Sequence, residues 1–140
     1  MLSKIIVGST KQGAALAAGS FARASMNSTD AGGLDSAAFM SLHMLALGNT
    51  LDELLPEYDP IAQGSNQGPW VFSIPNEFQL YLSSLDSIGV EKLAENWAKS
   101  DELCDDGVEE EVAVSILSEV ANLARSAQSS GTGLLLWLSR

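Results

Sequence analysis

The chain has 140 residues, a hydrophobic fraction of 46% and a formal net charge of −11. This length and apolar content are typical of one globular domain and exclude intrinsic disorder. The negative charge repels phosphate backbones and anionic lipid headgroups, so it disfavours nucleic acids and membrane surfaces as partners.

The first elements are expected before residue 34. Residues 5–7 form a β-branched run that indicates a buried strand. Ser9 and Gln12 have the spacing of a capping box, which predicts the start of a helix that continues to Ser25. Residues 26–33 are rich in turn-forming side chains and are expected to be a loop.

A helix is predicted over residues 36–47, with Asp35 as its N-cap and Gly48 at its end. Apolar side chains occupy nearly all of its faces, which is typical of a buried helix. Thr50 and Glu53 form a second capping box, which predicts one or two helical turns ending at Pro56.

The middle of the chain alternates between irregular and regular segments. Residues 57–69 are expected to be irregular, and residues 70–74 to form a short strand. A helix follows from Pro75 to Leu85. The next helix starts at a cap formed by residues 86–87 and carries an apolar stripe up to Ala98.

A long amphipathic helix is predicted from Glu109 to Ala127, followed by a turn and by the apolar strand 134–138. The chain is thus expected to be one α+β domain over residues 1–140. Its small sheet would have about three strands, which are N-terminal, central and C-terminal, packed with four to five helices. The two terminal strands are candidates to pair with each other.

An acidic segment is the most distinctive feature of the sequence. Eighteen residues of the chain are acidic, and seven of them fall between positions 101 and 111. These seven are Asp101, Glu102, Asp105, Asp106, Glu109, Glu110 and Glu111. An EF-hand is excluded because Ala113 occupies the position of the bidentate glutamate. Three interpretations stay open: solvation with stabilisation of a helix start, a surface that binds a basic partner, or a looser divalent-cation site.

No catalytic motif, metal-binding pattern or cofactor fingerprint accompanies these acids. His43 is the only histidine, so no multi-histidine metal site can form. A lone histidine on an apolar helix is typically a core residue. The alternative is a cleft formed by His43, Tyr58 and Trp70, in which His43 reaches both solvent and a carboxylate.

One resemblance spans residues 34–85. A helix bearing Ser41, Leu42 and His43 precedes a turn-rich loop, an extended run and a helix that begins at Pro75. This order resembles the YfbM-like family of small uncharacterised bacterial proteins. The resemblance implies an α+β fold and no chemistry.

The leading hypothesis is a non-enzymatic binding protein whose acidic segment docks a basic partner, as in a bacterial immunity or antitoxin-type inhibitor. The first alternative is a small enzyme or ligand-binding domain that uses the cleft. The second is a homo-oligomeric structural protein whose terminal apolar segment pairs with a copy of itself. Cys104 is the only cysteine and no leader or membrane span is evident, so a cytoplasmic location is expected.

Overall fold

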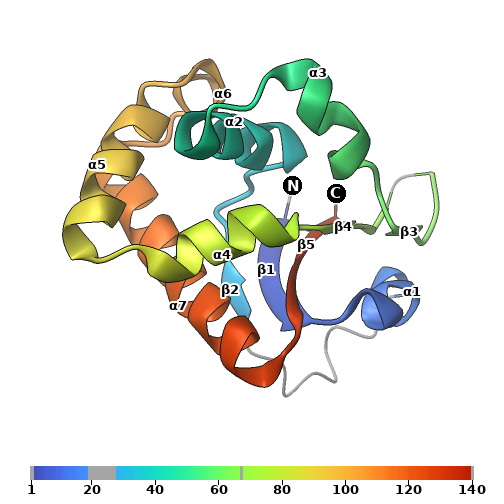
Figure 1. The fold of residues 1–140 in the computed structure, drawn as a ribbon. Coiled ribbons are helices and arrows are strands. Elements are labelled where there is room, and N and C mark those ends of the chain that lie inside the picture. The colour runs from blue at the N-terminus through green and yellow to red at the C-terminus, as the bar shows by residue number, and fades with distance from the viewer. Residues whose placement is uncertain (1, 19–27, 67, 140) are drawn as a thin grey trace.

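A computed structural model describes residues 2–18, 28–66 and 68–139. Within them the fold is α+β, with seven α-helices and a five-stranded antiparallel sheet (Figure 1). The elements are β1 (Leu2–Gly8), η1 (Thr10–Gln12), α1 (Gly13–Ala17), β2 (Ser28–Asp30), α2 (Ser36–Leu47), α3 (Leu51–Leu54), η3 (Leu55–Tyr58), β3 (Ala62–Gln63), β4 (Trp70–Ser73), α4 (Asn76–Ser84), α5 (Ser87–Ala98), α6 (Asp101–Asp105), α7 (Glu110–Ser130) and β5 (Gly133–Ser139).

The sheet has the order β2-β1-β5-β4-β3, so the two terminal strands lie at its centre. β1 and β5 pair antiparallel from Leu2 opposite Ser139 to Gly8 opposite Gly133. The two ends of the chain therefore meet, as Figure 1 shows. The three predicted strands and the pairing of the terminal strands are confirmed.

The predicted number of strands was too small. β2 lies in the segment 26–33, which was expected to be a loop, and β3 lies in the segment 57–69. These strands have three and two residues. Such lengths are too short to show an alternating pattern, and pairing with β1 and β4 is what makes these residues extended.

The predicted number of helices was also too small, and α6 within the acidic segment was not foreseen. Pro56 does not end the helical turns after Thr50, since η3 continues through it to Tyr58. The helix expected from Ser9 to Ser25 is present as η1 and α1. Its last part, residues 19–25, lies outside the described residues.

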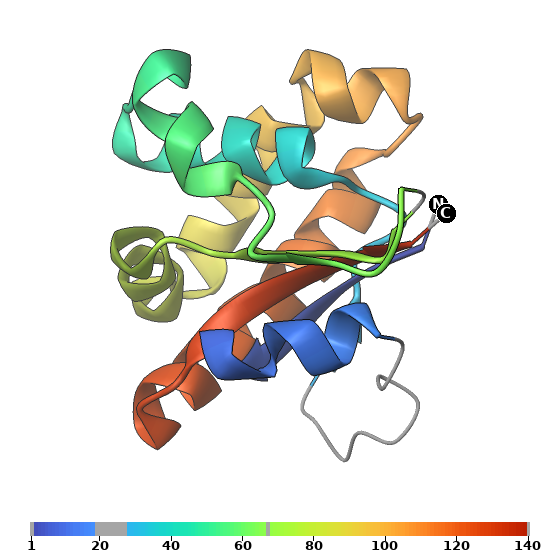
Figure 2. The ribbon, with the colours of Figure 1, turned by 90° about the vertical axis from the view of Figure 1, so that its right-hand side faces the viewer.

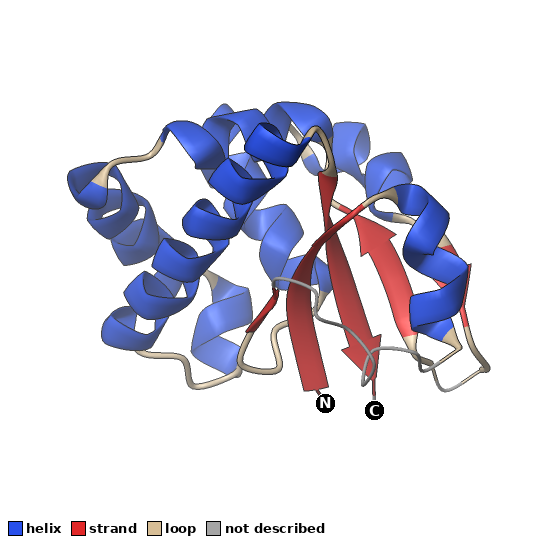
Figure 3. Cartoon of the chain, turned by 90° about the horizontal axis from the view of Figure 1, so that it is seen from below, coloured by secondary structure: helices blue, strands red, loops and turns tan. Residues whose placement is uncertain are grey.

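The sheet separates two layers. Most helices cover one face and α1 covers the other (Figures 2 and 3). Alternate residues of the strands supply the two cores, because successive side chains of a strand point to opposite faces. The larger core contains Ile5 and Leu136, whereas Ile6 and Trp137 lie in the smaller core with Leu16.

The helix boundaries follow local capping. The Asp35 side chain accepts a hydrogen bond from the Ala38 amide, and Gly48 ends α2 in the left-handed conformation with φ of 75°. Both agree with the prediction. α7 packs against α4, α5 and β1, and its stripe of buried apolar side chains fills the larger core.

Candidate functional site

The acidic segment connects α5 to α7 and lies at the surface. Six of its seven carboxylate side chains are exposed, and Glu102 is half-buried. Along the ranges 2–18, 28–66 and 68–139, no ion pair involves any of the seven. Two of the nearby cations have other partners: Lys99 pairs with Glu95, and Arg125 donates to the Leu85 carbonyl and to Asn122. The segment therefore presents its charge to solvent.

Buried apolar residues hold the acidic segment in place. Ser100 caps α6 by accepting a hydrogen bond from the Leu103 amide, and the Leu103 side chain is fully buried. After Gly107, the Val108 amide donates to the Leu103 carbonyl, and α7 begins behind the N-cap Glu109. Because the apolar side chains face inward, the acids between them face outward.

A groove of about 480 Å³ lies between α5 and the start of α7. Figure 1 shows these helices side by side at the left of the molecule. The groove is lined by Ile88, Glu91, Lys92, Glu95, Glu110, Glu111 and Val114. Each helix thus contributes one apolar side chain and two carboxylates.

The side chains that line the groove have a net negative charge. Lys92 is the only cation among its lining residues. Lys99 contacts Glu95 at 3.4 Å, four residues away on the same helix, and both side chains are exposed. Exposed pairs of this kind are worth about 0–1 kcal/mol, so a competing cation can displace Lys99. Carboxylates around an apolar floor fit a basic side chain with a long aliphatic stem.

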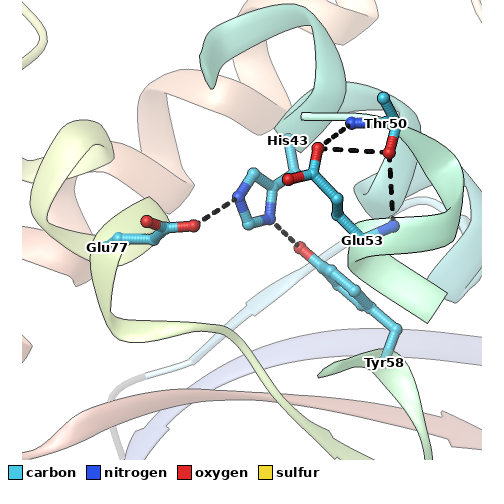
Figure 4. Close-up of polar contacts among 5 residues, drawn as sticks. All are labelled: His43, Thr50, Glu53, Tyr58 and Glu77. Carbon is cyan, nitrogen blue, oxygen red and sulfur yellow. Dashed lines mark hydrogen bonds and ion pairs between the residues drawn. The ribbon is translucent and has the colours of Figure 1, made fainter. Parts of the chain in front are cut away.

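A second polar cluster lies around His43 in α2 (Figure 4). Its imidazole is fully buried and stacks on Phe78, with 4.5 Å between the ring centroids and 16° between the planes. Nδ1 lies 3.0 Å from the Tyr58 hydroxyl in η3, and Nε2 lies 3.5 Å from the Glu77 Oε1 in α4. The ring thus joins three elements that are separate in the sequence.

The protonation of this cluster follows from its environment. Burial lowers the pKa of His43, although the Glu77 and Glu57 carboxylates oppose that shift. Burial also raises the pKa of Tyr58, so its hydroxyl stays protonated. A neutral imidazole with its proton on Nε2 directs that proton toward Glu77 and accepts the Tyr58 proton at Nδ1. The Nε2–Oε1 distance is longer than a well-formed hydrogen bond, which leaves Nε2 poorly satisfied.

The three residues expected to line a cleft are placed differently. His43 and Tyr58 are brought together by their hydrogen bond. Trp70 lies in β4, opposite Gln63 and Leu138, and its ring packs on Gly68. His43 reaches a carboxylate, as the cleft hypothesis requires, but its exposed fraction is 0%, whereas that hypothesis requires contact with solvent. The buried imidazole therefore lies at the junction of α2, η3 and α4, where it contacts Tyr58 and Glu77.

Two parts of these clusters were not foreseen. The sequence places Glu91 and Glu95 on the outer side of α5 but does not show that α7 lies beside them. Glu77 follows Pro75 in the first turn of α4, where an acid is explained by the helix dipole alone. The spacing of Glu91 and Glu95, four residues apart, was the available signal for a shared face.

Comparisons with known proteins return no matching family model, no matching curated protein and no matching solved structure. The resemblance to the YfbM-like family stays a prediction. Over the described ranges, no three or more histidine, cysteine or acidic side chains come together in a group that could hold a metal ion. None of the helices in that part of the chain is long and apolar enough to cross a membrane.

Proposed function

We propose that this chain is a non-enzymatic binding protein whose α5–α7 groove takes a basic segment of a partner protein. The observation that carries the proposal is the composition of the groove. The groove has a volume of about 480 Å³. One wall carries Glu91 and Glu95 of α5, and the other carries Glu110 and Glu111 of α7. A lysine or arginine can lay its stem on Ile88 while its charge meets these carboxylates.

The charge of the rest of the chain supports a cationic partner. From residue 24 to residue 91 there is no lysine or arginine, while nine acidic residues occur there. A field of one sign steers an oppositely charged protein to the surface and raises its association rate. An immunity or antitoxin-type inhibitor, acting on a basic toxin in the cytoplasm, is the concrete form of this proposal.

A lysine–serine peptide with a fluorescent label tests the groove directly. We expect the peptide to bind at about 0.05 M salt and to dissociate at about 0.5 M, because screening weakens contacts between exposed charges. The double variant Glu91→Gln with Glu111→Gln removes one carboxylate from each wall. It should weaken binding about 5- to 30-fold if each of the two lost contacts is worth about 0.5–1 kcal/mol.

The matched control removes two exposed carboxylates that do not line the groove, in the double variant Asp59→Asn with Glu119→Gln. Its net charge equals that of the groove variant, so overall charge cannot explain a difference between them. In anisotropy titrations, the affinity of the control variant for the lysine–serine peptide should differ less than twofold from that of the wild type. Equal losses in the two variants, or binding that ignores salt, would overturn the proposal.

A further inference from the structure

Helix α2 is apolar on nearly every face, yet the fold does not cover it completely. Leu42 and His43 are fully buried, whereas Leu45 is 46% exposed and Leu47 is 38% exposed. Leu51, the first residue of α3, is 49% exposed. Single exposed leucines are ordinary at a protein surface, but Leu51 also lines a pocket.

A pocket of about 280 Å³ opens beside this part of the molecule, between α2, α3 and α6. These three helices lie together at the top of Figure 1. The pocket is lined by Ala37, Met40, Ser41, Met44, Leu51 and Glu102. Its walls are therefore mostly apolar, and one carboxylate of the acidic segment stands among them.

Two of the six lining side chains are methionines, and this affects what the pocket can accept. Methionine is unbranched and polarizable, so a methionine-lined surface adapts to apolar side chains of different shapes. Met40 is 9% exposed and Met44 is half-buried, which places both in contact with the core and within reach of a ligand. The pocket is suited to a leucine, isoleucine or aromatic anchor.

The negative charge of the surrounding helices favours a cationic partner segment as the one that carries this apolar anchor. α2, α3 and α6 contain no lysine or arginine. α3 contributes the exposed carboxylates of Asp52 and Glu53, and α6 contributes those of Asp101 and Asp105 beside Glu102. Glu102 is the only charged side chain that lines the pocket, so an apolar side chain that enters here meets a negative charge.

We propose that this pocket takes the apolar anchor of a cationic amphipathic helix in the partner protein. The inference rests on the proposed function and names the form of the basic segment. A helix gathers its apolar side chains in one stripe and flanks them with its lysines or arginines. That arrangement matches an apolar pocket bordered by carboxylates. A second copy of this chain would bring carboxylates against carboxylates at −11 per chain, so the charge disfavours it.

The test compares two labelled peptides on the full chain. In the lysine–leucine peptide, leucines recur at helical spacing; the lysine–serine peptide keeps the same lysines and replaces every leucine. We expect the lysine–leucine peptide to bind about tenfold more tightly, because only it can fill the pocket.

Two pocket variants and one control accompany the peptides. Ala37→Trp places an indole at an exposed position on the pocket wall, and Leu51→Ser removes an exposed apolar side chain from it. Leu80→Ser is the control, because Leu80 is 47% exposed on α4 and lines neither the groove nor the pocket. Circular dichroism melting curves check that all three variants are folded.

Both pocket variants should weaken the lysine–leucine peptide about tenfold and change the lysine–serine peptide less than twofold. Leu80→Ser should change neither affinity more than twofold. The inference is overturned if the lysine–leucine peptide is no tighter than the lysine–serine peptide, or if Ala37→Trp and Leu51→Ser both leave its affinity unchanged. Sedimentation equilibrium supplies a third contrary result, a dimer of the free chain that Ala37→Trp dissociates.

These outcomes separate the inference from the proposed function. If the lysine–serine peptide binds through the groove carboxylates and the leucines add nothing, the inference fails alone. If only the lysine–leucine peptide binds, and Ala37→Trp abolishes it, the pocket is supported and the groove proposal fails. If neither peptide binds at low salt, both fail.

Discussion

The two polar clusters of this molecule lie in opposite environments, one buried in the core and the other exposed to solvent. His43 is fully buried between Phe78 and Tyr58, and its hydrogen bond to Tyr58 holds α2 against η3. Glu110 and Glu111 are exposed on the wall of a groove and have no ion-pair partner in the described ranges. A buried polar group without a hydrogen-bond partner lowers the stability of the folded state. The hydrogen bond of His43 is therefore needed for the stability of the fold.

The exposed carboxylates have no such role in the stability of the fold. Water solvates them in the free protein, and the free energy of folding depends little on whether they are paired. They are consequently available to a partner in a way that His43 is not. The difference assigns a role in stability to the buried cluster and leaves the exposed one for the binding that we propose. Each of the following measurements can contradict that division.

The largest expected effect is that of His43→Ala. It removes a fully buried ring that stacks on Phe78 and leaves a cavity, so the free energy of unfolding should fall by about 3 kcal/mol. Urea denaturation followed by tryptophan fluorescence measures this loss. A change under about 1 kcal/mol would show that the cluster is not a structural one.

Tyr58→Phe is expected to have the next largest effect. The ring keeps its volume, but Nδ1 of His43 loses its 3.0 Å partner inside the protein. A buried acceptor left without a hydrogen bond costs about 1–3 kcal/mol, so a loss of about 2 kcal/mol is expected in the same denaturation experiment. As a control, Tyr81→Phe alters a tyrosine that is only half-buried, and it should cost less.

Acidification should have a smaller effect on the same cluster. The pKa of His43 is lowered in the folded state, so between that value and 6.5 the unfolded chain binds a proton that the folded chain does not. Stability is therefore complete above 6.5 and decreases as the pH falls through this window. The Glu77 and Glu57 carboxylates attract the charged ring and limit the loss, while Tyr58 faces it as a protonated hydroxyl.

His43→Gln isolates this contribution, because its other titrating groups are those of the wild type. The free energies of unfolding at pH 7.5 and 5.5 should differ more in the wild type than in the variant. Parallel pH curves for the two proteins would contradict the assignment of the shift to His43.

The smallest expected effect is that of Glu110→Gln on stability. Glu110 is exposed in the first turn of α7, where its charge interacts favourably with the helix dipole, so the free energy of unfolding should fall by about 0.5 kcal/mol. The same variant should weaken binding of the lysine–serine peptide. If Glu110→Gln destabilised the fold as much as Tyr58→Phe, the contrast between the two clusters would disappear.

Much of the fold could be predicted from short segments. Asp35, the pair Thr50 and Glu53, and Asp86 each cap a helix where their spacing indicates one, because capping is a contact over three or four residues. The apolar run 134–138 was expected as a strand and forms most of β5. β2 and β3 were not foreseen because their extended form comes from pairing with β1 and β4.

The candidate sites were predictable to different degrees. The acids of residues 101–111 were identified as exposed charge, and α6 was missed although Ser100 caps it and two acids occupy its first turn. His43 was expected to be a core residue and is fully buried, whereas its contact with Tyr58 belonged to the alternative hypothesis of a cleft. The position of Trp70, in β4 opposite Gln63 and Leu138, follows from strand pairing between distant segments, which no spacing reveals.

By itself, the sequence determined the amount and sign of the charge, the identity of the main helices and the strands at each end. These depend on composition and on contacts between near neighbours. Only the tertiary structure decided which acids share a groove, that His43 is sealed from solvent, and that α2 keeps apolar side chains at the surface. Those features depend on packing between segments distant in the chain, because burial is a property of the whole molecule.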